Sequence, residues 1–226
     1  MKHYLLAGIT ALGLLSGCSS PAPVKLQASI GTYKAATTGR SYVLVVRPQQ
    51  QPNSITVSVS GPGGYSENIT LQSASARTPS GVWWEIGWNA AQTLTSGTYT
   101  ISAVIDGQTE QVSVNVDASS TLAQPNVTIG PNPTTKSVTA SWNAVPGASG
   151  YLVRLINRTT NAVVASARLA SLSTTFSSLN LNTSDQYAVQ VYAANSNIAI
   201  DPPIVPTGQL NMALGESANF TVNPAP

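Results

Sequence analysis

The sequence predicts an all-β protein of two tandem β-sandwiches, which follow a signal peptide and a short tether. Three observations indicate this class. Charged residues make up 8% of the 226 residues, about a third of the roughly 25% usual in soluble domains. Serine, threonine, asparagine and glutamine supply the polarity instead, and together with many valines, glycines and prolines they favour strands and turns. Short runs rich in β-forming residues, bounded by turn residues, recur along the chain, which is typical of sandwiches.

Residues 1–17 have the pattern of a signal peptide, which must be set aside before the fold is considered. Lys2 provides a positive charge, and residues 4–15 form an apolar run of about a dozen residues, within the usual signal-peptide range. A bilayer-spanning helix needs roughly 20 apolar residues. No later run is that long, so we expect no transmembrane helix in the mature chain.

The apolar run ends in Leu15-Ser16-Gly17-Cys18, which contains the only cysteine of the sequence. This stretch resembles the lipobox of bacterial lipoproteins. The resemblance implies a diacylglyceryl group on Cys18, cleavage after Gly17, and a further acyl chain such as palmitate on the new amino terminus. Residues 18–24 would then be a lipidated tether, and we expect no cofactor besides this covalent lipid. The alternative is an ordinary secretory signal with an incidental cysteine.

The lipoprotein resemblance also predicts where the body of the protein lies. We expect an extracytoplasmic protein anchored to a membrane by its lipid. Ser19 follows the cysteine, and in family members with a Gram-negative-type envelope a non-acidic residue there usually accompanies sorting to the outer membrane.

Residues 25–117 are expected to form the first sandwich, which we interpret as immunoglobulin-like. Strands are predicted at residues 41–46, 54–60, 68–71, 82–88, 98–105 and 110–116, and Asp106-Gly107 between the last two is a strong hairpin signal. Tyr99 begins the penultimate strand after a leucine and a glycine. This is similar to the tyrosine corner of Greek-key sandwiches, so its role should be structural.

A tryptophan cluster lies in the predicted strand 82–88. Alternation places Trp84 and Trp88 on the core face, and Trp83 and Glu85 on the solvent face. The favoured interpretation is that Trp83 covers a sheet edge or meets the second domain. The alternative is that it stacks on a sugar ring.

A polar linker at residues 117–121 separates the second unit, residues 121–226, which resembles a fibronectin type III domain over nearly its whole length. Four residues carry the resemblance: the tryptophan that ends Ser137-Val138-Thr139-Ala140-Ser141-Trp142, the tyrosine after Gly150, and a leucine six residues ahead of a second tyrosine. The resemblance implies structural roles for Trp142, Tyr151, Leu181 and Tyr187.

The chain departs from the fibronectin pattern in a loop at residues 195–215, ahead of a final strand expected at residues 218–222. Loops this long are uncommon in compact domains, and this one is apolar, which argues against disorder. The favoured interpretation is that it covers a sheet edge or packs on the first domain. The alternative is a binding loop, because the family often carries ligand contacts here. Its candidate binding residues are Ile198, Ile200, Asp201, Ile204, Leu210 and Met212.

The residue inventory argues against several kinds of chemistry. The only histidine is His3, inside the predicted signal peptide, and Cys18 would be consumed by lipid. The mature chain would then lack imidazole and thiol groups, so we expect neither Ser-His or Cys-His catalysis nor a metal site of those ligands. The eight acids are scattered, and the formal net charge of +2 gives no basic field for nucleic acid.

These patterns together predict a non-catalytic, membrane-anchored lipoprotein of the cell envelope. We expect it to act as a binding or interaction module, in adhesion or as a scaffold, for an envelope protein. The alternative is a module that binds carbohydrate or cell wall through exposed aromatic side chains such as Trp83.

Overall fold

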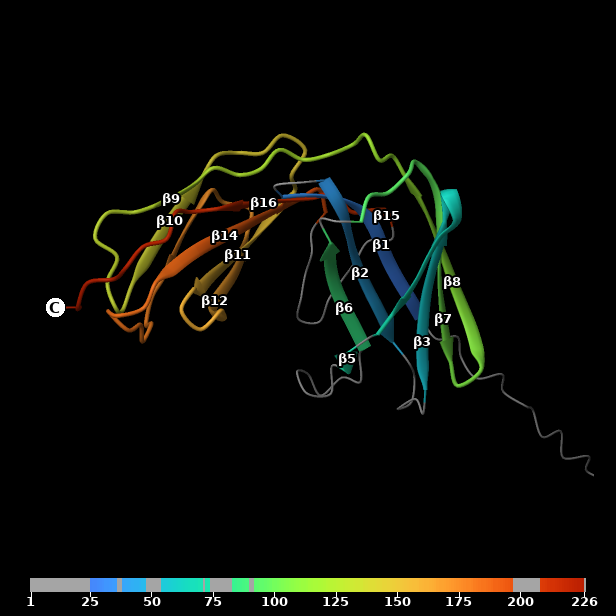
Figure 1. Cartoon of the computed structure of the whole chain (residues 1–226), viewed down its shortest axis with the longest axis horizontal. Helices are drawn as coiled ribbons and strands as arrows, with labels where there is room; N and C mark the ends of the chain where they lie inside the picture. Colours follow the sequence, from blue (N-terminus) through green and yellow to red (C-terminus); the bar gives the residue numbers. More distant parts are fainter. Residues whose placement is uncertain are drawn as a thin grey trace, which may run out of the picture.

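A computed structural model of the chain describes residues 25–35, 38–47, 54–70, 72–73, 83–89, 92–196 and 208–225. Its regular elements are strands, apart from the short 3-10 helix η1 (Pro62–Gly64). The strands form two sandwiches in sequence order (Figure 1). The predicted fold class, two tandem immunoglobulin-like or fibronectin-like sandwiches, is confirmed.

The first sandwich packs the sheet β4-β3-β7-β8 against the part β1-β2-β6-β5 of a larger sheet. Its strands are β1 (Lys25–Lys34), β2 (Thr38–Arg47), β3 (Ile55–Gly61), β4 (Tyr65–Ile69), β5 (Gln72–Ser73), β6 (Trp83–Asn89), β7 (Gly97–Ile105) and β8 (Gln108–Val116). Alternation in β3 turns Val57 and Val59 into the core that this sheet shares with β1. Asp106 and Gly107 both have positive φ, 47° and 84°, as the turn of the β7–β8 hairpin requires.

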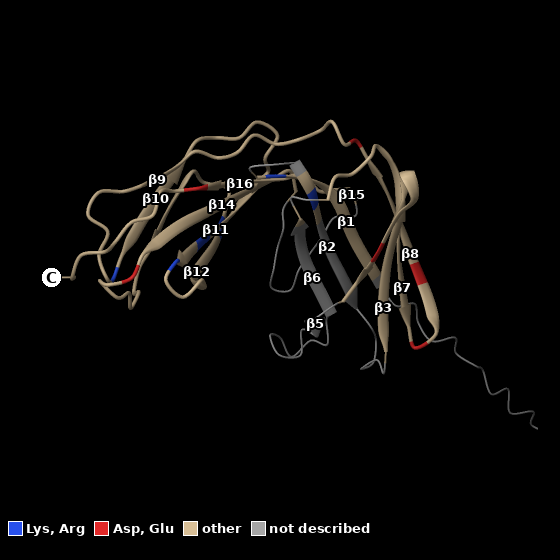
Figure 2. Ribbon diagram, viewed as in Figure 1, with Lys and Arg blue, Asp and Glu red and all other residues tan. Residues whose placement is uncertain are grey.

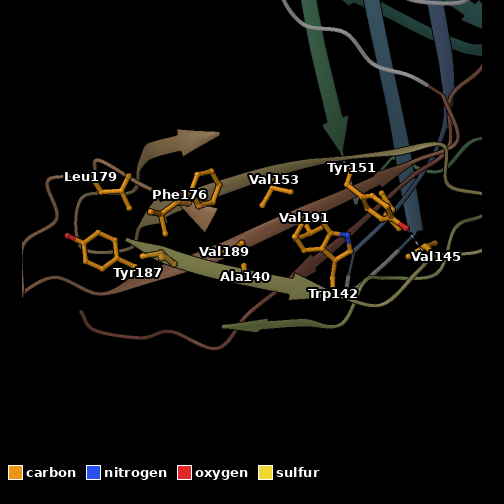
Figure 3. Packing of buried hydrophobic residues seen from close by; sticks show 14 of the residues in the cluster. Ala140, Trp142, Val145, Tyr151, Val153, Phe176, Leu179, Tyr187, Val189 and Val191 are labelled. Carbon is orange, nitrogen blue, oxygen red and sulfur yellow. Dashed lines mark hydrogen bonds between the residues drawn. The ribbon is translucent and has the colours of Figure 1, made fainter. Parts of the chain in front are cut away.

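The second sandwich packs the sheet β13-β10-β9 against β12-β11-β14-β16. Its strands are β9 (Val127–Ile129), β10 (Val138–Trp142), β11 (Gly150–Asn157), β12 (Ala162–Leu169), β13 (Ser173–Phe176), β14 (Tyr187–Ala194) and β16 (Met212–Glu216). Trp142 lies against Tyr151 in its core, with ring centroids 5.6 Å apart (Figure 3). Tyr151 in turn accepts a hydrogen bond from the backbone N–H of Val145 over 3.0 Å.

The two sandwiches share one sheet, with the strand order β12-β11-β14-β16-β1-β2-β6-β5. The last strand of the second sandwich, β16, pairs in parallel with the first strand of the first sandwich, with Tyr33 opposite Met212. Just before it, β15 (Gly208–Gln209) pairs with β1 as well, with Ser29 opposite Gly208. In Figure 1 these strands meet at the top of the bend between the sandwiches.

The position of the final strand corrects one sequence-based prediction. The strand is β16, at Met212–Glu216, and not residues 218–222, where Phe220 makes only an isolated bridge to Tyr187. The physical reason is packing from both sides, since β16 lies between β14 and β1 and buries Met212 and Ala213 completely. In the described ranges no helix is long and apolar enough to cross a membrane.

Candidate functional site: the domain junction

The junction between the sandwiches is built on a close backbone approach. The N–H of Leu210 donates to the carbonyl oxygen of Ile30 over 3.1 Å. A Cβ added to Gly31 would lie 2.0 Å from the carbonyl oxygen of Leu210, so only glycine fits at this point. The hydroxyl of Ser41, on the neighbouring strand β2, donates to that same oxygen over 2.8 Å. The backbone at Leu210 thus contacts two strands of the first sandwich, β1 and β2.

Asn211 is the centre of a buried polar network at the junction, with 3% of its surface exposed. Its Oδ1 accepts hydrogen bonds from the backbone N–H of Thr32 over 3.2 Å and from the Thr32 hydroxyl over 3.0 Å. Its Nδ2 donates to the hydroxyl of Ser120 over 2.9 Å. One side chain therefore joins β1, the linker and the segment ahead of β16.

The linker itself is fixed by Gln209 and Ser120. The side-chain amide of Gln209 accepts from the N–H of Asp117 over 2.9 Å and donates to the Asp117 carbonyl over 2.8 Å. The carboxylate of Asp117 accepts hydrogen bonds from the hydroxyl and N–H of Ser119, which lower the pKa of Asp117. The Thr32 hydroxyl shares its single proton between Asn211 Oδ1 and the Ser120 carbonyl oxygen, which lies 2.8 Å away. The network thus joins β1, the linker, β15 and the segment just before β16.

Apolar side chains fill the rest of the junction. Tyr33, Leu210 and Met212 are 3%, 1% and 0% exposed, and they belong to neither sandwich core. Burial raises the pKa of Tyr33, and the nearby Tyr192 and Glu216 raise it further. Because Tyr33 comes from β1 and Met212 from β16, this contact holds the two sandwiches together.

A partly buried ion pair joins the two sheets of the first sandwich. Arg40 on β2 pairs with Glu67 on β4, and its side chain is 5% exposed. Its Nε also donates to the side-chain oxygen of Gln92 over 2.7 Å, and the hydroxyl of Tyr65 donates to Glu67 over 2.7 Å. Burial, followed by the hydrogen bond to Glu67, raises the pKa of Tyr65. The pair joins the two sheets of this sandwich, since β2 and β4 belong to different sheets.

The structure describes only some of the binding residues that the sequence predicts. The backbone of Trp83 and Glu85 lies in β6, paired with β2, but their side chains lie outside the described residues, as do Ile198, Ile200, Asp201 and Ile204 and the lipobox with Cys18. Leu210 and Met212, which the sequence offered as binding candidates, are buried junction residues. Leu210 bonds to Ile30 of β1, and Met212 lies opposite residues of β1 and β14. The described part of the 195–215 loop therefore packs on the first domain.

The predicted structural residues all lie in the sandwich cores. The hydroxyl of Tyr99 donates to the Thr95 carbonyl over 3.0 Å and accepts from the Thr95 N–H over 3.1 Å. The hydroxyl of Tyr187 does the same with Asn182, over 3.2 and 2.8 Å. Each sandwich thus has its own tyrosine corner. Trp142, Tyr151 and Leu181 are buried in the core of the second sandwich.

Sequence reasoning missed the polar residues of the junction, namely Thr32, Ser41, Ser120, Gln209 and Asn211. Serine, threonine and asparagine are so frequent in this chain that none of them is conspicuous. The one signal was Leu210-Asn211-Met212-Ala213-Leu214, whose alternation of large apolar residues is typical of a strand.

A surface hollow lies away from the junction, beside β9 and the C-terminal segment of the second sandwich. Its volume is about 500 Å³. Phe220 and Pro133 provide apolar surface, Gln186 and Asn219 provide amides, and none of the described residues that line it is charged. Its chemistry suits a neutral, hydrogen-bonding ligand. In the described part of the chain, no three histidines, cysteines or acids form a group that could hold a metal ion.

Comparisons with known proteins give likenesses of fold. No protein-family model matches the sequence, and no curated protein matches it. A segment of two fibronectin type III domains from chicken tenascin is 13% identical, with 89% of this chain and 99% of that chain covered and a TM-score of 0.35. The fn3 domain of human collagen alpha-1(XX) is 15% identical, with 48% of this chain and 91% of that chain covered and a TM-score of 0.32. The BSP domain of a biofilm associated protein is 14% identical, with 88% of this chain and 30% of that chain covered and a TM-score of 0.30. These solved structures resemble the chain in its all-β, sandwich-like organisation.

Proposed function

We propose that this protein is a lipid-anchored, non-catalytic interaction module of the cell envelope, whose two sandwiches form one stiff arm. The observation that carries the proposal is the pairing of β1 with β15 and β16, which makes one sheet of the two domains. Tandem domains usually move relative to one another unless their interface is extensive. Here strand pairing, the Asn211 network and the Tyr33–Met212 contact all oppose such motion.

The position of the anchor adds a second argument. Six residues separate Cys18 from Lys25, where β1 begins, and six extended residues span at most about 20 Å. The lipid would therefore hold the first sandwich close to the membrane surface. It would do so through β1, the same strand that pairs with the second sandwich. Such an arrangement suits a scaffold that carries load or holds a partner at a fixed distance.

The anchor is tested by membrane partition of the full-length chain. We expect the wild type to enter the detergent phase and to carry the mass of the lipid on Cys18. The Cys18→Ser variant should instead stay uncleaved or be released from the membrane. Ser19→Ala is the matched control, because it leaves the lipobox intact. Unchanged partition and mass in Cys18→Ser would refute the lipid anchor.

The stiff arm is tested by a distance distribution between spin labels on the two sandwiches. Thr109 and Ser171 are exposed positions in the first and second sandwich, and Thr109→Cys with Ser171→Cys in a Cys18→Ser background gives one label on each. We expect a single narrow distribution that broadens when Asn211→Ala is added. A broad distribution without Asn211→Ala would contradict the proposal.

A carbohydrate-binding function is the second candidate, and the hollow at Phe220 favours it. An aromatic face beside side-chain amides can stack on a sugar ring and bind its hydroxyls. Retention on purified wall glycan, lost in Phe220→Ala or in Trp83→Ala, would support this function and would tell the two aromatic sites apart. Retention that survives both substitutions would exclude both sites.

A further inference from the structure

The strand β12 forms one edge of the nine-stranded sheet. It pairs with β11 on one side, and its other side has no strand partner among the described residues. Its first half is exposed, with Val163 at 52% and Val164 at 38%. An open edge presents unpaired backbone N–H and C=O groups, which are a template for another extended segment.

Arg168 lies on this strand, on the face turned away from the core of the second sandwich. It stands opposite Leu152, whose neighbours Tyr151 and Val153 point into the core. Side chains of directly opposite residues share one face of a sheet. Arg154 lies on the same face, and its guanidinium group lies 5.5 Å from the centre of the Tyr192 ring. Figure 2 shows basic positions on both β11 and β12.

Among the described residues, no carboxylate forms an ion pair with the guanidinium group of Arg168. Its Nη1 and Nη2 atoms are buried and have no hydrogen-bond partner. Burial, followed by the charge of Arg154, lowers the pKa of Arg168 to about 10. Two other arginines of the chain do pair with carboxylates, Arg40 with Glu67 and Arg158 with Glu216.

A buried, unpaired guanidinium group is unfavourable, and a carboxylate is the group that matches its geometry with two parallel hydrogen bonds. Arg168 lies on an edge strand and has a long, flexible side chain. Rotation of this side chain can bring its guanidinium group to the open edge of β12. The cation and the open edge thus lie on one strand.

We propose that β12 is a docking edge for an extended segment of a partner protein that carries an aspartate or glutamate opposite Arg168. The inference rests on the proposed interaction function and names its surface. Val163 and Val164 lie four to five residues from Arg168 along the strand, so the segment also carries an apolar residue at that spacing from its acid. A lipid headgroup or a sugar would leave the backbone edge unpaired, and for that reason a peptide is the occupant.

The test uses two synthetic nine-residue peptides of alternating threonine and valine, identical except for a central glutamate or glutamine. Each is titrated to millimolar concentration into the isotope-labelled chain beginning at Ser19, which keeps every described residue. We expect the glutamate peptide to shift the amide signals of residues 162–169 and to bind about tenfold more tightly than the glutamine peptide, as a charge-assisted hydrogen bond implies. The peptide comparison uses the unaltered body of the protein, so it does not depend on a variant that folds.

Arg168→Gln should abolish the preference for glutamate. Arg158→Gln, which removes an arginine already paired with Glu216, should keep it. Equal affinity of the two peptides, no binding, or shifts confined to other strands would overturn the docking edge. Because the anchor and spin-label tests do not involve β12, their success together with failure here would refute this inference alone. Failure of those tests would refute the proposed function.

Discussion

Thr32 and Asn211 lie 179 positions apart in the sequence, yet one amide oxygen of Asn211 accepts hydrogen bonds from both the N–H and the hydroxyl of Thr32. Thr32 is 2% exposed and Asn211 is 3% exposed, so water cannot readily replace either bond. The pair fixes the register between β1 and β16, because a one-residue slip would leave the N–H of Thr32 buried without a partner.

We expect Asn211→Ala to lower the free energy of unfolding by about 2 to 4 kcal/mol. The substitution leaves the Thr32 N–H buried and unpaired, and a buried unsatisfied group costs about 1–3 kcal/mol. It also removes the hydrogen bond to Ser120. Chemical denaturation measures the change.

Asn219→Ala is the matched control for Asn211→Ala. Asn219 is exposed, and its amide makes only a long 3.5 Å contact with Gln186, so its loss should change stability by less than about 0.5 kcal/mol. Equal effects of the two substitutions would show that the junction network does not stabilise the fold.

Gly31→Ala is expected to be more damaging than its size suggests. The new Cβ would lie 2.0 Å from the carbonyl oxygen of Leu210, and backbone cannot yield as a side-chain tip does. We expect a loss of about 3 kcal/mol or more, read from the denaturation midpoint. Gly107→Ala is the comparison, because it has open space and positive φ and should cost only about 1–2 kcal/mol. A smaller effect at Gly31 than at Gly107 would contradict the close approach.

Local motifs made much of the fold predictable from the sequence. The Asp106-Gly107 hairpin and the corners at Tyr99 and Tyr187 involve residues within about six positions of each other, so their spacing alone identifies them. The pairing of β1 with β16 has no such signature, since it is parallel and joins the two ends of the chain. Its polar partner Asn211 looks, in sequence, like any surface asparagine.

The candidate sites were predicted less well, for a related reason. Leu210 and Met212 were recognised as apolar residues in an unusual place, but exposure and burial against another domain give the same sequence pattern. Nothing in the sequence distinguishes Arg168 from other arginines. Only the strand order shows that it lies on an edge, and only the packing shows that its Nη1 and Nη2 atoms have no hydrogen-bond partner.

The two tyrosine corners provide a test of whether the sandwiches unfold together. Tyr99→Phe and Tyr187→Phe each remove a corner hydroxyl, and each should cost about 1–3 kcal/mol. If the shared sheet couples the domains, both substitutions shift the same single thermal transition, although they lie in different sandwiches. Calorimetry that resolves two transitions, each sensitive to only one substitution, would show that the domains unfold independently.

Stability at alkaline pH should depend on Tyr33. Burial, together with the nearby Tyr192 and Glu216, raises the pKa of Tyr33 above the ordinary tyrosine value of 10.0. A raised pKa in the folded state means that the unfolded chain loses its proton first. The contribution of neutral Tyr33 is therefore fully present below pH 10 and is lost as pH rises above it. Above about pH 10 the free energy of unfolding falls as pH rises, and we expect this fall to be less steep in Tyr33→Phe than in the wild type. Asn219→Ala should leave this slope unchanged. An identical slope in the wild type and Tyr33→Phe would place the alkaline sensitivity elsewhere, with Tyr65, whose pKa is also raised by burial, as the next residue to substitute.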